Sequence, residues 1–292
     1  MAKTIDEGFR EFHGTLTPKR GESQAVKCHR TSIKACLEKN FKVTRFFPTG
    51  SFENGTSIRG YSDADYFACI PTKNLKEHSV TTLQEVREVL IKSFPNADIS
   101  IKIPTVKVCF GTNASESIEI VPAGFIQKDK NGNDIYKIAN SDGAGGWMRA
   151  SPDVHNKYVD KINKRLECKV EPLVRLLKAW KYYHSVPVRS FYLEMYAAKY
   201  ASRQGFIDYS YDLKCIFQSL WDRRLGALSD PTGISGSILP CSSPEQKIDA
   251  LKKLEAAFKR AQKAQGAEDS EKIIDAFNEW KLVFGKKFPS YG

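Results

Sequence analysis

The pattern of apolar residues changes near residue 151, and this change restricts the fold more than any other feature of the sequence. Before it, short runs rich in β-branched and aromatic residues predict strands, as in FKVTRFF at 41–47 and SIEIVPAGF at 117–125. After it, the leucines and the tryptophan of 173–180 form one apolar stripe at helical spacing. The sequence therefore predicts an α+β chain with a strand-rich front half and a helical back half.

The same patterns divide the chain into two expected domains, residues 1–150 with a long N-terminal helix and residues 151–292, which are helical and close the cleft of the first. A groove between two such parts is a natural place for a binding site. We expect a β-rich run at 99–110, and loops and turns at 127–146 and 229–243. Helices are expected at 23–40, 79–93, 191–203, 211–225, 244–264 and 269–284.

Composition narrows the class of protein. Hydrophobic residues make up 41% of the 292 residues, which excludes disorder as the main state. The seven cysteines are widely spread without a CxxC pair, and no apolar run reaches about 18 residues, so we expect a reduced, soluble chain in the cytoplasm with no membrane partner. The net charge of +11 attracts molecules that carry phosphate, although many ordinary soluble proteins are as basic.

Two aspartates stand in a predicted buried strand. Side chains alternate along a strand, so Asp63 and Asp65 are expected on one face, where their charges repel. A divalent cation would relieve this repulsion, and Mg²⁺ takes one or two carboxylates together with water and phosphate oxygens. An isolated Asp-x-Asp pair is more often simply solvated at a strand edge.

The neighbouring sequence favours the metal. Gly50 and Ser51 follow a predicted strand, where backbone N–H groups and a hydroxyl can hold a phosphate. Glu119 falls on another apolar strand and would supply a third acid if the strands are neighbours; Glu116 is its rival. Three acids beside a phosphate loop predict a site for phosphoryl or nucleotidyl transfer with two Mg²⁺ ions, or Mn²⁺ in their place.

Several segments carry a resemblance to a known family. GSFENGTSIRGYSDADYF resembles the Gly-Ser and Asp-x-Asp signature of the polymerase-β-like nucleotidyltransferases, and SIEIVPAGF resembles the strand with their third acid, which is often Asp where this chain has Glu119. LVRLLKAWKYY and VPVRSFYLEMYAAKYA are similar to the helical segment of the oligoadenylate synthase and cyclic GMP-AMP synthase branch, and in particular to its bacterial members, the CD-NTases. WMRASPDVHNKYVDKIN and DPTG extend the similarity over most of residues 45–285.

The resemblance implies a nucleotidyltransferase core, a mixed sheet with flanking helices, followed by a helical domain. It also implies roles for residues of the back half. Lys178 of RLLKAW, preferred to Lys181, would contact the triphosphate of a nucleotide, and Ser190 would contact its phosphates. Phe191, with Tyr192 as the alternative, would stack on the base. Without the resemblance, these residues would be a solvated helix face, an N-cap and core aromatics.

By the same resemblance, the chain would make cyclic di- or trinucleotides from NTPs, ATP among them, for anti-phage defence, and a separate effector protein would read the product. Nucleic acid would not be required, and no Cys/His zinc insertion is evident. His155 has no evident acid partner and is expected to be structural. The alternatives are a transferase that tails RNA without a template, as CCA-adding enzymes do, a small-molecule nucleotidyltransferase, and a nucleic-acid-binding protein with an inactive core.

Overall fold

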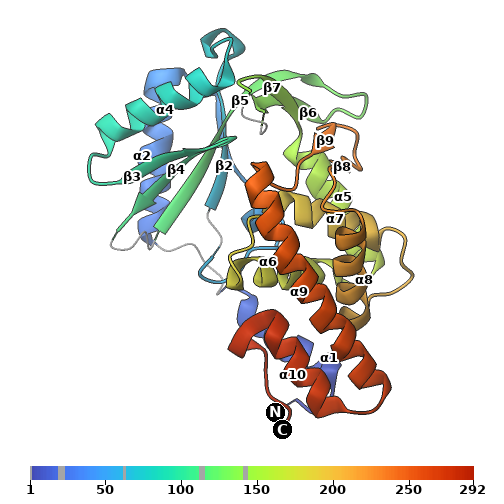
Figure 1. The fold of residues 1–292 in the computed structure, drawn as a ribbon. Helices are drawn as coiled ribbons and strands as arrows, with labels where there is room; N and C mark the ends of the chain where they lie inside the picture. The colour runs from blue at the N-terminus through green and yellow to red at the C-terminus, as the bar shows by residue number, and fades with distance from the viewer. Residues whose placement is uncertain (1, 19–23, 62–63, 112–115, 141–143) are drawn as a thin grey trace.

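The computed structural model describes residues 2–18, 24–61, 64–111, 116–140 and 144–292 (Figure 1). A sheet with two covering helices forms one half of the molecule, and a bundle of helices forms the other. The two ends of the described chain meet at the far end of the helical half, where Ala2 forms a β-bridge with Tyr291.

The described strands form a seven-stranded mixed sheet in the order β1-β2-β5-β4-β3, with β6 paired to β5 and β7 paired to β6. The β2–β5 pair is parallel and the other pairs are antiparallel. Because β5 is 13 residues long, its first part pairs with β4 and its last part with β6. The strands are β1 (Arg45–Thr49), β2 (Ala64–Cys69), β3 (Asp98–Lys102), β4 (Thr105–Phe110), β5 (Glu116–Lys128), β6 (Asp134–Ala139) and β7 (Trp147–Ala150).

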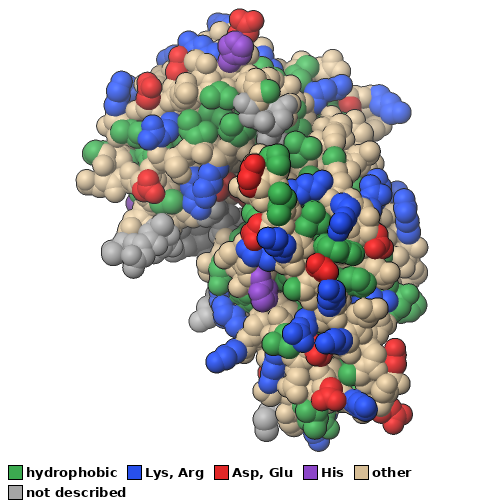
Figure 2. Space-filling view, in the orientation of Figure 1, with side chains coloured by type: hydrophobic (Ala, Val, Ile, Leu, Met, Phe, Trp, Pro, Cys, Tyr) green, Lys and Arg blue, Asp and Glu red, His purple; other side chains and the backbone are tan. Residues whose placement is uncertain are grey.

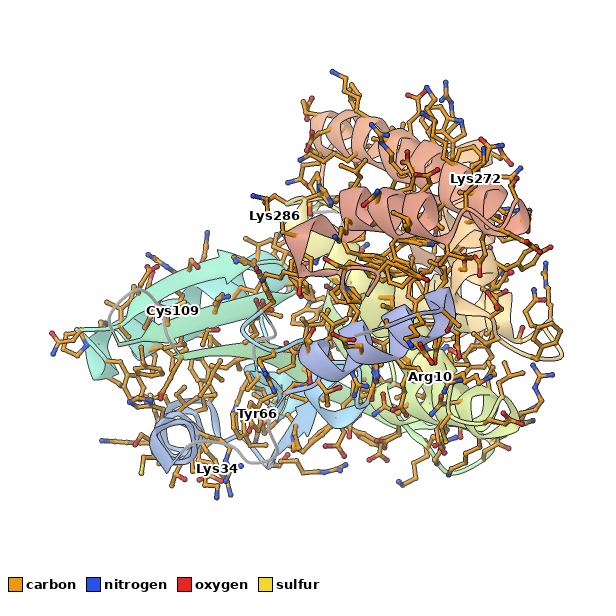
Figure 3. All side chains as sticks on the ribbon, turned by 90° about the horizontal axis from the view of Figure 1, so that it is seen from below. Arg10, Lys34, Tyr66, Cys109, Lys272 and Lys286 are labelled. Carbon is orange, nitrogen blue, oxygen red and sulfur yellow. The ribbon has the colours of Figure 1, made fainter. Side chains whose placement is uncertain are left out.

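Two helices, α2 (Gln24–Phe41) and α4 (Ser79–Ser93), pack together against the sheet and bury their apolar positions in one core with it. Leu37 of α2 and Leu90 of α4 are fully buried in this core, beside Ile118 of β5. Figure 3 shows Lys34 on the outer side of α2, where its charge stays in solvent. The short helix α3 (Gly50–Glu53) follows β1, and the 3₁₀ turn η1 (Thr72–Asn74) follows β2.

The helical half has a larger core of its own, and the predicted apolar stripe of 173–180 lies inside it. A two-stranded ribbon of β8 (Leu228–Ser229) and β9 (Ser237–Ile238) precedes the last helices. The elements are α5 (Pro152–Arg165), α6 (Val170–Tyr183), α7 (Ser190–Ala201), α8 (Tyr209–Asp222), α9 (Pro244–Asp269), α10 (Ile273–Phe284) and the 3₁₀ turn η3 (Gly285–Lys287).

The six predicted helices are confirmed within a few residues of their ends, but three regions differ from the prediction. Residues 127–146 were expected to be loop, but they contain the end of β5 and all of β6. Pairing with β5 on one side and β7 on the other stabilises β6, although the turn-forming residues around it favour a loop. The helix α5 was not predicted. Neither was α1 (Ile5–Leu16), although its capping box of Thr4 and Glu7 is a readable start signal.

Helix α1 also departs from the expected division of the chain at residue 150. Its Phe9 and Phe12 are fully buried among the C-terminal aromatics, and Phe9 meets the ring of Trp280 edge-on at 4.9 Å between centroids. The first helix of the chain is therefore part of the helical core, because its apolar face finds its partners at the other end of the sequence.

Candidate functional site

Two of the predicted acids lie next to each other at the centre of the sheet. In the parallel pairing of β2 with β5, Asp65 is directly opposite Glu119. Residues opposite each other in register project to the same face, so both carboxylates share one side of the sheet. The prediction that the strands of these two acids are neighbours is confirmed. Asp63, the remaining predicted acid, lies outside the described residues.

The predicted phosphate loop begins against this pair. Gly50 follows β1, has a φ of 67°, and is so close to Asp65 that a Cβ at this position would overlap the Asp65 carboxylate. Only glycine adopts this conformation without strain and leaves the necessary space. Gly50 and Ser51 are the first two residues of α3, so the Gly-Ser pair begins beside the acid.

Glu119 is oriented by the neighbouring strand β4. The Thr105 hydroxyl donates a hydrogen bond of 3.2 Å to Glu119 Oε2, and Lys107 Nζ lies 4.0 Å from Oε1. The rival acid Glu116 is an odd number of residues away on the same strand and so faces the other way. Its Oε2 lies 3.0 Å from Nδ1 of His29. Glu119, not Glu116, is therefore the acid that accompanies Asp65.

On the helical half, Ser190 begins α7 and contacts α6. Lys181 Nζ donates a hydrogen bond of 2.6 Å to Ser190 Oγ and lies 4.5 Å from the centre of the Tyr182 ring. The Tyr182 hydroxyl is 3.3 Å from the same serine oxygen. Ser190 is the first helical residue and Arg189 is the N-cap, so the expected N-cap position was one residue late. Lys181 and Ser190 thus form a partly buried polar pair.

Lys178 lies elsewhere, and the reading that applies without the resemblance, a solvated helix face beside Lys181, does not hold for it. Its side chain is 1% exposed, and its Nζ is 2.7 Å from Glu194 Oε2 and 2.8 Å from the Thr56 hydroxyl oxygen. Burial alone would raise the pKa of Glu194, but the charge of Lys178 and the hydrogen bonds donated to the carboxylate lower it. The Lys178 ammonium is therefore engaged by protein groups, and Lys181 is the lysine next to Ser190.

The two candidate base-stacking aromatics differ in exposure. Phe191 is 41% exposed, whereas Tyr192 is fully buried and its hydroxyl donates a 2.8 Å hydrogen bond to the Gly226 carbonyl. Only Phe191 of the two presents a ring surface to solvent. The edge of Phe191 also meets the ring of His155, 5.1 Å away between centroids.

His155 has an acid partner that sequence reasoning missed. It is buried, and its Nε2 lies 2.9 Å from Oδ2 of Asp230, in the DPTG segment that follows β8. Burial would raise the pKa of Asp230, but the bond to His155 and backbone N–H groups, including that of Ser235, hold it below its usual range. The pairing agrees with a structural role for His155. The two residues are 75 positions apart, so no local sequence pattern indicates that they pair.

The loop that leads from Ser51 toward the acids is bonded to the helical half. Asn54 and Thr56 donate hydrogen bonds of 2.9 and 3.0 Å to the two carboxylate oxygens of Glu194 on α7. Further along the loop, the ring of Tyr61 stacks on that of Tyr182 at 5.2 Å. The acids of the sheet and the Lys181–Ser190 pair are thus linked through one loop. Glu194 was also missed, although a single acid in the apolar run of α7 was the available signal.

The donor set suits a hard divalent cation. Adjacent carboxylates of Asp65 and Glu119 are the oxygen ligands that Mg²⁺ or Mn²⁺ prefers. Within the described ranges, which omit Asp63, no group of three His, Cys, Asp or Glu side chains is close enough to hold a metal ion. The pair therefore fits part of a metal site whose third predicted ligand is Asp63. In the same ranges, no helix is long and apolar enough to cross a bilayer.

A known family model matches the front part of the chain. The family model of the Second Messenger Oligonucleotide or Dinucleotide Synthetase (SMODS) domain matches residues 3–163, more than half of the 292 residues. A probable cyclic nucleotide synthase of Bacillus cereus (strain VD146) is 26% identical over 174 residues, which are 59% of this chain and 52% of the relative. The matched part thus spans about half the length of that relative.

Longer alignments cover the helical half as well. The CBASS oligonucleotide cyclase CdnC of Escherichia coli (strain KTE188) is 24% identical over 282 residues, 88% of this chain and 87% of the relative. The solved structure of E. coli MS115-1 CdnC with ATP has a TM-score of 0.70 at 17% identity and covers 98% of this chain and 99% of that one. This likeness confirms the predicted fold, a mixed sheet with flanking helices followed by a helical region. The resemblance to the bacterial CD-NTases is confirmed, and the chain belongs to the SMODS family of nucleotidyltransferases.

Proposed function

We propose that this chain is a Mg²⁺-dependent nucleotidyltransferase that joins NTPs into a cyclic di- or trinucleotide in the cytoplasm. The observation that carries the proposal is the register of Asp65 opposite Glu119, directly beside Gly50. A pair of carboxylates at a phosphate loop is the arrangement that two-metal transfer of a nucleotidyl group requires.

The triphosphate of the donor nucleotide lies, in this proposal, between the Gly50–Ser51 loop and the Lys181–Ser190 pair. Lys181 replaces Lys178 in this role because the Lys178 ammonium is buried against Glu194, whereas Lys181 is only partly buried. A lysine held by a serine hydroxyl can exchange that contact for a phosphate oxygen at little cost. The exposed ring of Phe191 offers the base a stacking surface.

Asp65 and Glu119, together with Asp63, would hold the cation that the reaction requires. Mg²⁺ bound there would favour deprotonation of the attacking ribose hydroxyl and offset the charge of the departing pyrophosphate. Thr105 and Lys107 keep the Glu119 carboxylate oriented toward the shared face, so it need not reorganise when the nucleotide binds. The new bond joins the ribose oxygen to the α-phosphorus and the bond to pyrophosphate breaks. A second round closes the ring of a dinucleotide, and a third round closes that of a trinucleotide.

The similarity to E. coli CdnC, which is named a CBASS oligonucleotide cyclase and was solved with ATP, supports ATP as a substrate and a role in anti-phage defence. A cyclic product serves as a signal only if another molecule binds it. The proposal therefore includes a separate effector protein that reads the product.

The net charge of +11 favours a second candidate, the addition of nucleotides to an RNA end. Figure 2 shows Lys and Arg side chains scattered over both halves of the visible face and mixed with acidic ones, not gathered in one stripe. A stripe along a groove is what an RNA backbone would need. On this face, the distribution favours the nucleotide-joining reaction over the RNA-tailing one.

The test incubates the purified chain with the four NTPs and Mg²⁺, with and without RNA, and identifies the products by mass spectrometry. The proposal expects cyclic oligonucleotides and pyrophosphate in the absence of RNA, and none after chelation of the metal with EDTA. Products that appear only as extensions of the added RNA would overturn it in favour of the second candidate.

A further inference from the structure

Lys178 and Glu194 form a buried ion pair that the proposed reaction does not use directly. Their side chains are 1% and 4% exposed, and the Lys178 Nζ to Glu194 Oε2 distance is 2.7 Å. Taking two charges out of water is unfavourable, and an apolar pair of the same volume often stabilises a fold equally well. The fold alone therefore gives little reason for charges at these two positions.

The contacts around the pair point to one segment of the chain. Thr56 donates to Glu194 and accepts from Lys178, and Asn54 donates to the other oxygen of Glu194. The Thr56 N–H in turn donates a 2.9 Å hydrogen bond to the Ser51 carbonyl. Among the described residues, the polar contacts of the Glu194 carboxylate are thus made with Lys178 and with the segment that begins at Gly50.

The Lys178–Glu194 pair is the next contact along α6 and α7 from the Lys181–Ser190 pair. Lys178 precedes Lys181 by three residues on α6, and Glu194 follows Ser190 by four residues on α7, so each is about one helical turn away. One set of contacts between α6 and α7 therefore holds the loop, and the next set along the helices is the Lys181–Ser190 pair, to which we assign the phosphates.

We propose that Lys178 and Glu194 are positioning residues that fix the Gly50–Thr56 loop for binding of the nucleotide triphosphate. This inference rests on the proposed function, because it assigns the loop to the triphosphate. The pair sets the distance between the loop and the two helices, and with it the fit of the phosphates between Ser51 and Lys181.

The experiment compares two double variants that both remove the buried charges. In Lys178→Met with Glu194→Gln, the amide can still accept from Asn54 and donate to Thr56. In Lys178→Met with Glu194→Leu, the loop loses these partners. Both are measured for melting temperature, for hydrogen exchange of amides 50–56, and for binding of α,β-methylene-ATP with Mg²⁺ by calorimetry. Glu279→Gln, which removes the Glu279 charge from the remote Arg260–Glu279 ion pair, is the control.

We expect the two double variants to melt within a few degrees of each other. The leucine variant should exchange amides 50–56 at least tenfold faster and bind the analogue at least tenfold more weakly than the glutamine variant. Equal exchange and equal binding in the two variants would overturn the proposal, since the pair would then be structural only. A wild-type chain that binds the analogue but makes no cyclic product would contradict the proposed function and leave the exchange comparison as a separate test of the pair.

Discussion

The sheet and the helical half contribute to the site by different means. On the sheet, strand pairing alone brings Asp65 opposite Glu119, and the two acids come from neighbouring strands of one ladder. On the helical half, two lysines one turn apart on α6 have different environments: Lys178 is buried against Glu194, and Lys181 contacts Ser190 nearer the surface. Strand register sets the relative positions of the two acids, whereas burial distinguishes the two lysines.

This difference has a practical consequence for reading such sequences. Alternation along a strand is a strict rule, so a side chain assigned to a face stays on it. A helix presents a continuous range of directions, so residues three apart can differ in burial according to what packs against them. Site residues on strands are therefore easier to predict than site residues on helices.

The largest expected effect tests the sheet side of the comparison. Glu119→Gln should lower kcat by at least roughly 1000-fold, because loss of a charge that holds the cation removes several kcal/mol of transition-state stabilisation. Glu116→Gln is the matched control on the same strand; it removes the charge next to His29, on the opposite face from Asp65, and should retain near wild-type kcat. Pyrophosphate release measures both. If Glu116→Gln proves the more damaging change, the assignment of the third acid is wrong.

The next largest effect tests the helical side. Lys181→Met should raise the KM for ATP about 100-fold with little change in melting temperature, since a charge-assisted bond to phosphate contributes about 1.5–3 kcal/mol. Lys178→Met should lower the free energy of unfolding by about 3–5 kcal/mol, an effect not expected of Lys181→Met, because it leaves the Glu194 charge buried without its partner. Steady-state kinetics and chemical denaturation separate the two outcomes, and the exposed Lys263→Met controls for the loss of a positive charge. A KM unchanged by Lys181→Met would argue against this part of the site.

A smaller effect concerns the adjacent aromatics of α7. Phe191→Ala should raise the KM for the preferred nucleotide about tenfold, as expected for one base–aromatic stack, and Phe191→Tyr should restore it. Tyr192→Phe removes only the hydrogen bond to the Gly226 carbonyl, so it should cost about 1 kcal/mol of stability with the KM unchanged. The reverse pattern, with KM altered by Tyr192→Phe alone, would exchange the roles of the two rings.

The smallest effect lies away from the cleft, at the contact between α1 and α6. Arg175 donates a 2.7 Å hydrogen bond to Nε2 of His13, and burial followed by the charge of Arg175 lowers the pKa of His13 to about 4. Between about pH 6.5, the usual value, and pH 4, the unfolded chain binds a proton that the folded chain does not, so stability falls as the pH falls through this window.

His13→Gln keeps an acceptor for Arg175 and removes the titration. Melting temperatures measured from pH 7 to pH 4 should therefore decline less steeply for the variant than for the wild type, with the same kcat at pH 7.5. Identical slopes would show that His13 does not account for the acid sensitivity of the helical half.

The sequence by itself determined many of the elements and the chemistry of the acids, although α1, α5 and β6 were missed. The β-branched runs, the apolar stripe of 173–180 and the placement of Glu119 inside an apolar strand were all readable, because local propensity and periodicity determine them. The Gly50–Ser51 position was readable for the same reason, since a positive φ after a strand requires glycine.

Only the tertiary structure decided which distant residues meet. Lys178 pairs with Glu194, His155 pairs with Asp230, and α1 packs against the C-terminal aromatics. In each case, the sequence pattern of one segment does not indicate which other segment it contacts. Burial depends on what packs against a helix from elsewhere in the chain, and no local period carries that information. For this reason the resemblance implied only that a lysine of α6 contacts phosphate, and the structure adds that Lys178 is buried against Glu194 whereas Lys181 lies beside Ser190.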